Sequence, residues 1–181
     1  MSGVNTLKVD LVDKMGSDLS VVNAARVSFA KKSNWDDSIP FAEGNILKDS
    51  DVKLIKYLAK HNHWSPFAHA SLQFRIKAPI FVARQLVKHQ VGLVWNEISR
   101  RYVDTEPELY IPKVWRKRPP DDIKQGSDES ETIKYGIDGT MMFVKETYQN
   151  LLKEGVAPEM ARMVLPQNLY TEWYWSGTLY A

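Results

Sequence analysis

The spacing of apolar and polar residues along the chain predicts two strands and five helices. Leu7, Val9 and Leu11 alternate with polar residues, as in a strand, and a longer alternation over 70–78 predicts a second strand. Helical spacing, with capping and helix-breaking residues, predicts the helices. They cover 18–29 after a Ser17 cap, 51–59 after a Ser50 cap, 79–89 with Gly92 beyond it, 129–154 and a short stretch opened by Pro158.

Three other segments lack a regular period. Residues 30–48 and 113–122 predict loops, the second because it is rich in charge and proline. Residues 93–103 fit neither a helix nor a strand pattern. The last stretch, NLYTEWYWSGTLYA, stays apolar to its end. It is interpreted either as a docked final element or as an element that depends on something this chain does not encode.

Composition places the chain among ordinary globular proteins. Its 181 residues, 44% hydrophobic and 25% charged, suit one domain over 1–181. The absence of cysteine excludes disulfides, thiolate metal sites and cysteine nucleophiles from this chain. A net charge of +2 argues against a dedicated nucleic-acid-binding protein. No apolar run reaches the roughly 20 residues of a membrane span and no secretory leader is seen, so we expect a cytoplasmic protein without a membrane partner.

The densest group of polar residues beside apolar sequence lies at 84–102. Its first part is predicted to be helical, and residues four apart share a helix face. This pairs Arg84 with Lys88 and Gln85 with His89. The spacing therefore predicts two cations on one face and an amide with an imidazole on another.

The second part of this group places Glu97, Ser99 and Arg101 on one side if it is extended. Cations and a hydroxyl bind phosphate, and a carboxylate or amide reads an imide edge, so the group suits a nucleoside monophosphate. The alternative is a solvated helix face followed by a basic loop, which the spacing alone favours modestly. Eight Lys/Arg against four Asp/Glu over 84–118 also leave nucleic-acid contact open.

Histidine and arginine elsewhere carry weaker signals. His61 and His63 have no nearby carboxylate to complete a metal site, so they are interpreted as loop or capping residues. Trp64 and Ser65 beside them suit a flat cofactor and its phosphate. Arg162 in an apolar helix needs a structural ion pair or a bound anion. Neither a P-loop nor a GxGxxG motif is present.

Several motifs, in order and over nearly the whole chain, resemble the flavin-dependent thymidylate synthases. The central signature reads RQ, KHQ and NEISRRY between Arg84 and Tyr102. The flanking blocks are AARVSF from Ala24, HNHWSPF from His61, KAPIFVARQ from Lys77 and ARMVLPQNLYT from Ala161.

The resemblance implies an α+β fold with a twisted antiparallel sheet and long helices. It also implies a reaction, the methylation of dUMP to dTMP, with methylenetetrahydrofolate as carbon donor and reduced FAD as hydride donor. NADPH is the implied reductant of the flavin. The family is homotetrameric, with sites at subunit interfaces. The absence of cysteine fits, because the implied chemistry needs no thiolate nucleophile.

The resemblance further assigns residues to the two ligands. Those that match dUMP-contacting positions are Gln85, Lys88, Glu97, Ile98, Ser99, Arg100, Arg101 and Arg162. Those that match positions at or near FAD are Ser28, His63, Ser65, Lys88, His89, Gln90 and Glu97. Arg101 is expected to reach the nucleotide of a neighbouring subunit, and no metal is expected.

Three departures from the family pattern indicate a divergent, phage-like variant. Lys88-His89-Gln90 stands where the family has Arg-His-Arg, so Lys88 lacks the bidentate fork of an arginine and Gln90 lacks its charge. Eight residues instead of seven separate Gln90 from Ser99, which predicts a bulge around 93–95. Family members continue past the position of Ala181 with an arginine thought to activate the uracil, so no catalytic residue is assigned here.

Three functions follow as hypotheses. The first is an FAD-dependent thymidylate synthase whose C-terminal portion is missing or is supplied by a separate polypeptide. The second is a catalytically defective relative that still binds FAD or dUMP. The third is a nucleic-acid-binding module that uses the basic region 84–118. The order of the motifs favours the first.

Overall fold

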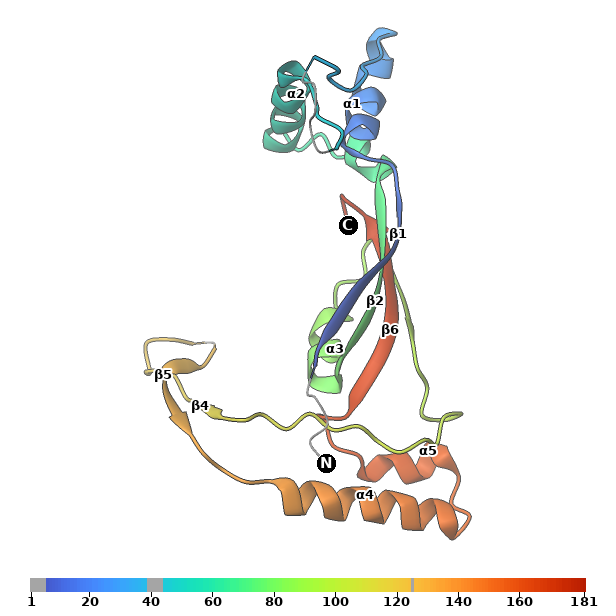
Figure 1. The fold of residues 1–181 in the computed structure, drawn as a ribbon, viewed down its shortest axis with the longest axis vertical. Coiled ribbons are helices and arrows are strands. Elements are labelled where there is room, and N and C mark those ends of the chain that lie inside the picture. Colours follow the sequence, from blue (N-terminus) through green and yellow to red (C-terminus); the bar gives the residue numbers. More distant parts are fainter. Residues whose placement is uncertain (1–5, 39–43, 125) are drawn as a thin grey trace. The chain divides into compact units, whose positions relative to one another are not determined.

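The computed structural model describes residues 6–38, 44–124 and 126–181 (Figure 1). These residues belong to two compact units. The first, here called the sheet unit, comprises Lys8–Ile76, Val87–Asn96 and Trp173–Ala181. The second, here called the cavity unit, comprises residues 6–7, Lys77–Leu86 and Glu97–Glu172. Each unit is therefore assembled from segments that are far apart in the sequence.

A four-stranded sheet has the order β1-β2-β6-β3, and most of its residues belong to the sheet unit. Its strands are β1 (Lys8–Met15), β2 (Ser71–Pro79), β3 (Leu93–Glu97) and β6 (Tyr170–Thr178). The strands predicted at 7–11 and 70–78 are confirmed. Trp173 is buried on β6 and stacks on Trp95 of β3, with ring centroids 4.4 Å apart. This aromatic pair holds the two strands together through apolar contact.

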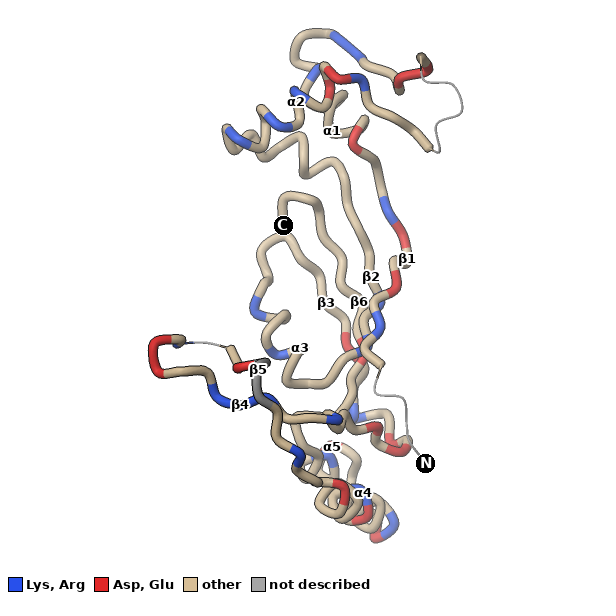
Figure 2. The backbone as a smooth tube through the Cα atoms, turned by 60° about the vertical axis from the view of Figure 1, so that its left-hand side comes forward, with Lys and Arg blue, Asp and Glu red and all other residues tan. Residues whose placement is uncertain are grey.

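Strand β1 lies at the edge of the sheet and is exposed along its whole length. Its apolar residues are accessible as well, Val9 for example to 65%. Charges of both signs interrupt it at Lys8, Asp10, Asp13 and Lys14 (Figure 2). Charged residues of this kind discourage an edge strand from pairing with other chains.

Helices α1 (Asp18–Arg26) and α2 (Asp49–Lys60) pack side by side in the sheet unit (Figure 1). The predicted Ser17 cap is confirmed, and the backbone N–H of Ser17 also donates to the Ser20 hydroxyl over 3.0 Å. The predicted Ser50 cap is wrong, because α2 begins at Asp49 with Lys48 as its N-cap. Two aspartates then lie in the first turn, where their charge suits the helix dipole.

The buried carboxylate of Asp51 joins α2 to α1 and to the loop that follows. Arg26 donates to Asp51 Oδ1, from Nε over 3.1 Å, and the Ser33 hydroxyl donates to Oδ2. Ser33 is held in turn by Asn23, whose Oδ1 accepts from the Ser33 backbone N–H over 2.7 Å. Both carboxylate oxygens are thus bonded, as burial of a charge requires.

Two short 3-10 turns complete the sheet unit. They are η1 (Val27–Phe29), which follows α1 directly, and η2 (Ser65–His69), which leads into β2. Because η1 begins at the residue after Arg26, the contact between Arg26 and Asp51 also anchors the backbone that carries Ser28.

The cavity unit contains α3, the described helices that follow β3, and one small antiparallel sheet. Its elements are α3 (Ile80–Leu86), β4 (Trp115–Lys117), β5 (Asp128–Ile133), α4 (Asp138–Lys153), α5 (Pro158–Ala161) and η3 (Arg162–Val164). The long helix α4 packs against α5 and η3 (Figure 1). The short helix predicted from Pro158 is confirmed, and so is the α+β fold that the resemblance implies.

Three predicted boundaries in this region are wrong. The helix predicted over 129–154 begins only at Asp138, because residues 128–133 form β5 and pair antiparallel with β4. For the same reason the predicted loop 113–122 contains a strand. Helix α3 ends at Leu86 and not at His89, since the chain turns there and Leu93 N–H donates to the Gln90 carbonyl over 3.2 Å. Among the described helices, none is long and apolar enough to cross a bilayer.

The Asp51 network generates a stability prediction with a defined pH dependence. Burial would raise the pKa of Asp51, but hydrogen bonds from Ser33 and Arg26 and the charge of Arg26 bring it below its usual value. The ionised carboxylate therefore stabilises the fold above the unfolded pKa of about 3.9, and this contribution is lost as the pH falls through the lower folded value. We expect Asp51→Asn to lower the free energy of unfolding by about 2–3 kcal/mol at pH 7.

Urea unfolding of the parent and of Asp51→Asn at pH 7, 5 and 3 measures this difference. The matched control is Asp49→Asn, the same change at an exposed position of the same helix turn. The difference in unfolding free energy between the parent and Asp51→Asn should be smaller at pH 3 than at pH 7. Two results would contradict this prediction. One is an equal loss of unfolding free energy in Asp51→Asn and Asp49→Asn. The other is a difference between parent and Asp51→Asn that does not change between pH 7 and pH 3.

Gly177 generates a second stability prediction. A Cβ atom added there would lie 3.0 Å from the Gly92 carbonyl oxygen and 2.4 Å from Leu93 Cδ2. The carbonyl cannot move without shifting β3, so Gly177→Ala should cost about 1–3 kcal/mol of unfolding free energy. Gly139→Ala is the control, because nothing lies within 4 Å of its added Cβ. Equal thermal midpoints for both variants would contradict the predicted close approach.

Candidate functional site

A cavity of about 140 Å³ lies within the cavity unit. It is lined by Ile80, Glu97, Ile98, Arg100, Arg162, Leu165, Leu169, Tyr170 and Thr171. Two guanidinium groups and one carboxylate stand beside an apolar wall. An anion with an attached flat or apolar group suits this composition better than an inorganic ion alone.

Glu97 reaches the cavity because β3 ends there against the first residues of β6. The Ile98 backbone N–H donates to the Glu172 carbonyl over 2.9 Å, which holds the end of β3 in place. The Thr171 hydroxyl donates to Glu97 Oε1 over 2.6 Å. The carboxylate thus accepts a hydrogen bond from a strand that is more than 70 residues away in sequence.

The arginines that follow Glu97 lie in a tight turn. Tyr102 and Val103 both donate their N–H groups to the Ser99 carbonyl, over 3.0 and 3.1 Å. An extended 97–101 was the condition for placing Glu97, Ser99 and Arg101 on one side, and this condition is not met beyond Ile98. The turn directs Arg100 into the cavity lining, where its guanidinium also donates to the Thr105 carbonyl.

Arg162 lines the same cavity but comes from a later part of the chain. It begins η3, directly after α5, and its Nε donates to the Glu159 carbonyl over 3.2 Å. Its side chain is exposed, so it is available to an anion in the cavity. Ile80 N–H donates to the Leu169 carbonyl over 2.8 Å, which ties α3 to the loop after η3 and closes the apolar wall.

The residues that the resemblance matches to dUMP divide into three groups. Those that the structure brings together in the cavity lining are Glu97, Ile98, Arg100 and Arg162. Those in the same unit but outside the lining are Gln85, Ser99 and Arg101. Lys88 belongs to the sheet unit.

The structure adds local contacts for the residues outside the lining. The Ser99 hydroxyl accepts from Arg101 Nε over 3.3 Å, so these two side chains hold each other. The predicted helix faces that pair Arg84 with Lys88 and Gln85 with His89 are wrong, because α3 ends at Leu86. Helical periodicity cannot relate residues on either side of that end.

Most residues that the resemblance matches to FAD lie in the sheet unit and are exposed. They are Ser28 on η1, His63 and Ser65 before and at the start of η2, and Lys88, His89 and Gln90 in the turn after α3. Glu97 is the exception and belongs to the cavity unit. Hydroxyls and a cation suit phosphate, and imidazoles suit flat rings, so the donor set fits a dinucleotide cofactor.

The His63 backbone is well defined within this set. Its N–H donates to the Leu58 carbonyl over 2.9 Å, and Asn62 before it adopts the left-handed conformation with φ 54°. The His63 ring meets the Tyr57 ring edge-on, with centroids 5.9 Å apart. Among the described residues, no group of three or more His, Cys, Asp or Glu is placed to hold a metal ion.

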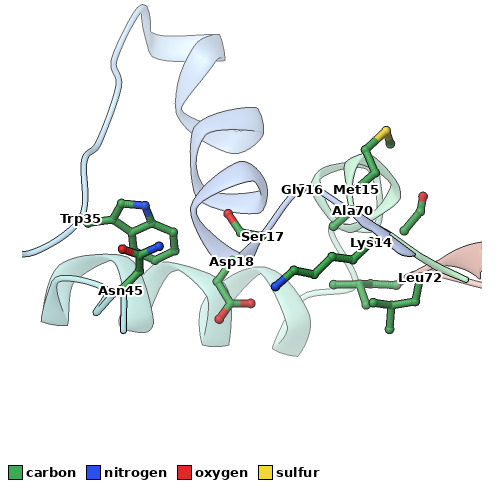
Figure 3. A pocket seen from close by; sticks show the side chains of 11 residues that line it. Lys14, Met15, Gly16, Ser17, Asp18, Trp35, Asn45, Ala70 and Leu72 are labelled. Carbon is green, nitrogen blue, oxygen red and sulfur yellow. The ribbon is translucent and has the colours of Figure 1, made fainter. Parts of the chain in front are cut away.

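A second cavity, of about 310 Å³, lies in the sheet unit where β1 meets α1 (Figure 3). The Lys14 side chain extends toward Asp18, while Trp35 and Asn45 lie together at one side (Figure 3). None of the residues matched to dUMP or FAD lines this cavity. It is therefore a feature separate from the residues discussed above.

The sequence predicted no role for five residues of the cavity lining, and Thr171 is the one of them that bonds to Glu97. It lies within a block that carried the resemblance, but no role followed from its position there. Alternation along β6 was a usable signal, because Thr171 and Trp173 fall on one face. Alternation does not reveal which strand lies beside β6, so it could not predict the contact of Thr171 with Glu97.

The chain is similar to known proteins along nearly its whole length. The family model described as thymidylate synthase complementing protein matches residues 10–181. A flavin-dependent thymidylate synthase of Kosmotoga olearia is 43% identical over 175 residues, which cover 93% of this chain and 70% of the relative. One from Thermus thermophilus is 42% identical over 178 residues, which cover 95% and 60%. The chain thus spans between 60% and 70% of the length of these two relatives.

Solved structures give the same likeness at the level of the fold. The crystal structure of a UMP/dUMP methylase from Streptomyces cacaoi bound with 5-Br dUMP aligns with a TM-score of 0.73 and 33% identity. The alignment covers 96% of this chain and 74% of that chain.

Proposed function

The chain belongs to the family of flavin-dependent thymidylate synthases, and from this we propose that it acts in the methylation of dUMP to dTMP. The carbon donor in this proposal is methylenetetrahydrofolate, and NADPH reduces the flavin. The observation that carries the proposal is the cavity that gathers Glu97 and Arg100 from one segment and Arg162 from another.

The chemistry of this cavity suits a uridine monophosphate. Guanidinium groups bind phosphate through charge-assisted and often bidentate hydrogen bonds, which Arg100 and Arg162 can each supply. The imide N–H of uracil needs an acceptor, and the Glu97 carboxylate is one. The apolar wall of Ile80, Leu165 and Leu169 offers a surface for the flat base.

The size of the cavity bears on assembly. Sites for small molecules commonly measure roughly 300–1,000 Å³, so a cavity of about 140 Å³ encloses part of a nucleotide. We propose that other copies of this chain, in a homotetramer, complete it. Arg101, outside this lining, is the residue that we assign to a neighbouring copy's nucleotide.

The exposed residues of the sheet unit are proposed to hold FAD. Ser28, Ser65 and Lys88 would bind its phosphates, and His63 and His89 would lie against its rings. Bound FAD, once reduced, supplies the hydride of the reaction. This chain has no cysteine, so no thiolate of its own attacks the uracil, and its task is binding and orientation. A cytoplasmic location stays a prediction from the sequence.

Spectroscopy tests the proposal as a whole. The purified chain, reconstituted with FAD and titrated with dUMP, should show flavin absorption bands that shift saturably with dUMP. The shift is expected because the cofactor and the substrate must meet during the reaction. CMP, which lacks the imide N–H, is the control and should cause no saturable shift. A retained flavin that responds equally to both nucleotides would contradict the proposal.

Arg162→Ala tests the phosphate contact. We expect dUMP to bind about 10- to 100-fold more weakly, because a charge-assisted hydrogen bond is lost. Arg162 is exposed and its hydrogen bond to Glu159 is local, so the thermal midpoint should stay close to that of the parent. Arg118→Ala, an exposed change outside the cavity, is the control in the same calorimetric titration. Equal affinity in the two variants would remove Arg162 from the site.

A further inference from the structure

The hydrogen bond between Thr171 and Glu97 is a contact between neighbouring strands inside the candidate site. Thr171 lies on β6 and Glu97 ends β3, and both side chains line the cavity. The donor and acceptor are 2.6 Å apart. Only 5% of Thr171 is accessible, whereas Glu97 is exposed. Thr171 is thus a buried donor to the carboxylate of an exposed glutamate.

The donor is rigid and the acceptor is flexible. Threonine is branched at Cβ, which restricts its χ1 angle, and its backbone is part of a strand. The residues that follow the pair are bonded as well, since Ile98 N–H donates to the Glu172 carbonyl, and this bond keeps the two strands aligned. Glutamate has three rotatable side-chain bonds, and fixing them before a ligand arrives lowers the entropy cost of binding.

We propose that Thr171 is a positioning residue that orients the Glu97 carboxylate toward the base of the bound nucleotide. The inference rests on the proposed function and adds to it a residue for which the resemblance gave no role. With Oε1 held by Thr171, rotation of the carboxylate is restricted and its plane is set. Thr171 then affects recognition of the base without touching it, because it acts only through Glu97.

Two substitutions separate the hydroxyl from the shape of the side chain. Thr171→Val removes the donor at nearly constant volume, and Thr171→Ser keeps the donor but removes the methyl group. We expect Thr171→Val to weaken dUMP binding about 10- to 100-fold, the usual effect of losing a hydrogen bond to a charged group. Thr171→Ser should bind within about threefold of the parent, since its hydroxyl can still donate. Thr171→Ala repeats the test should Thr171→Val fail to fold.

A double-mutant cycle distinguishes positioning from a general structural effect. In a Glu97→Ala background, Thr171→Val should have no further effect on dUMP binding, because the group that it orients is gone. Deoxyribose 5-phosphate, which lacks the base, should bind parent and Thr171→Val equally. Calorimetric or competition titrations measure all of these affinities on the full chain.

The outcomes separate this inference from the function on which it rests. A parent chain that binds no dUMP, with or without FAD, would contradict the proposed function and this inference with it. A parent that binds dUMP while Thr171→Val binds it equally well would overturn the inference alone. So would a Thr171→Val effect that persists undiminished in the Glu97→Ala background or extends to deoxyribose 5-phosphate.

Discussion

The pairing of β6 with β3 is the constraint on which the candidate site depends. It places Thr171 beside Glu97 and fixes Ile98 against Glu172, although these partners are more than 70 residues apart in sequence. The turn that carries Arg100 starts where this pairing ends. The stacked Trp95 and Trp173 reinforce the same pair of strands within the sheet unit. Strand pairing of this kind has to be complete before the polar residues of the cavity are neighbours.

The residues matched to the two ligands fall largely into different units. Those for the nucleotide belong to the cavity unit apart from Lys88, and those for the flavin belong to the sheet unit apart from Glu97. Each unit has its own means of fixing backbone near its ligand residues. In the sheet unit this is the buried Asp51 network beside η1, and in the cavity unit it is the contact between β3 and β6. Rigid secondary structure under a site is what precise binding requires.

Local sequence patterns predicted some of the helices and strands but few of the contacts between them. Alternation found β2 and the Ser17 cap found α1, because period and capping are properties of adjacent residues. The segment 128–133 was assigned to a helix, since its pairing with β4 is a contact that no local pattern records. The same limit applied to 84–89, where a helix face was assumed beyond the true end at Leu86. Glu97 and Arg162 were singled out by residue type and by the resemblance, whereas their shared cavity follows from tertiary packing.

Crystallographic location of a bromine-labelled nucleotide tests the central claim most directly. The full chain soaked with 5-bromo-dUMP would give an anomalous bromine signal that marks the base without reference to any assumed pose. The account predicts a bromine peak at the cavity lined by Glu97 and Ile98, with phosphate density at Arg100 or Arg162. A bromine peak in the separate cavity of Lys14 and Trp35, with the first cavity empty, would contradict it.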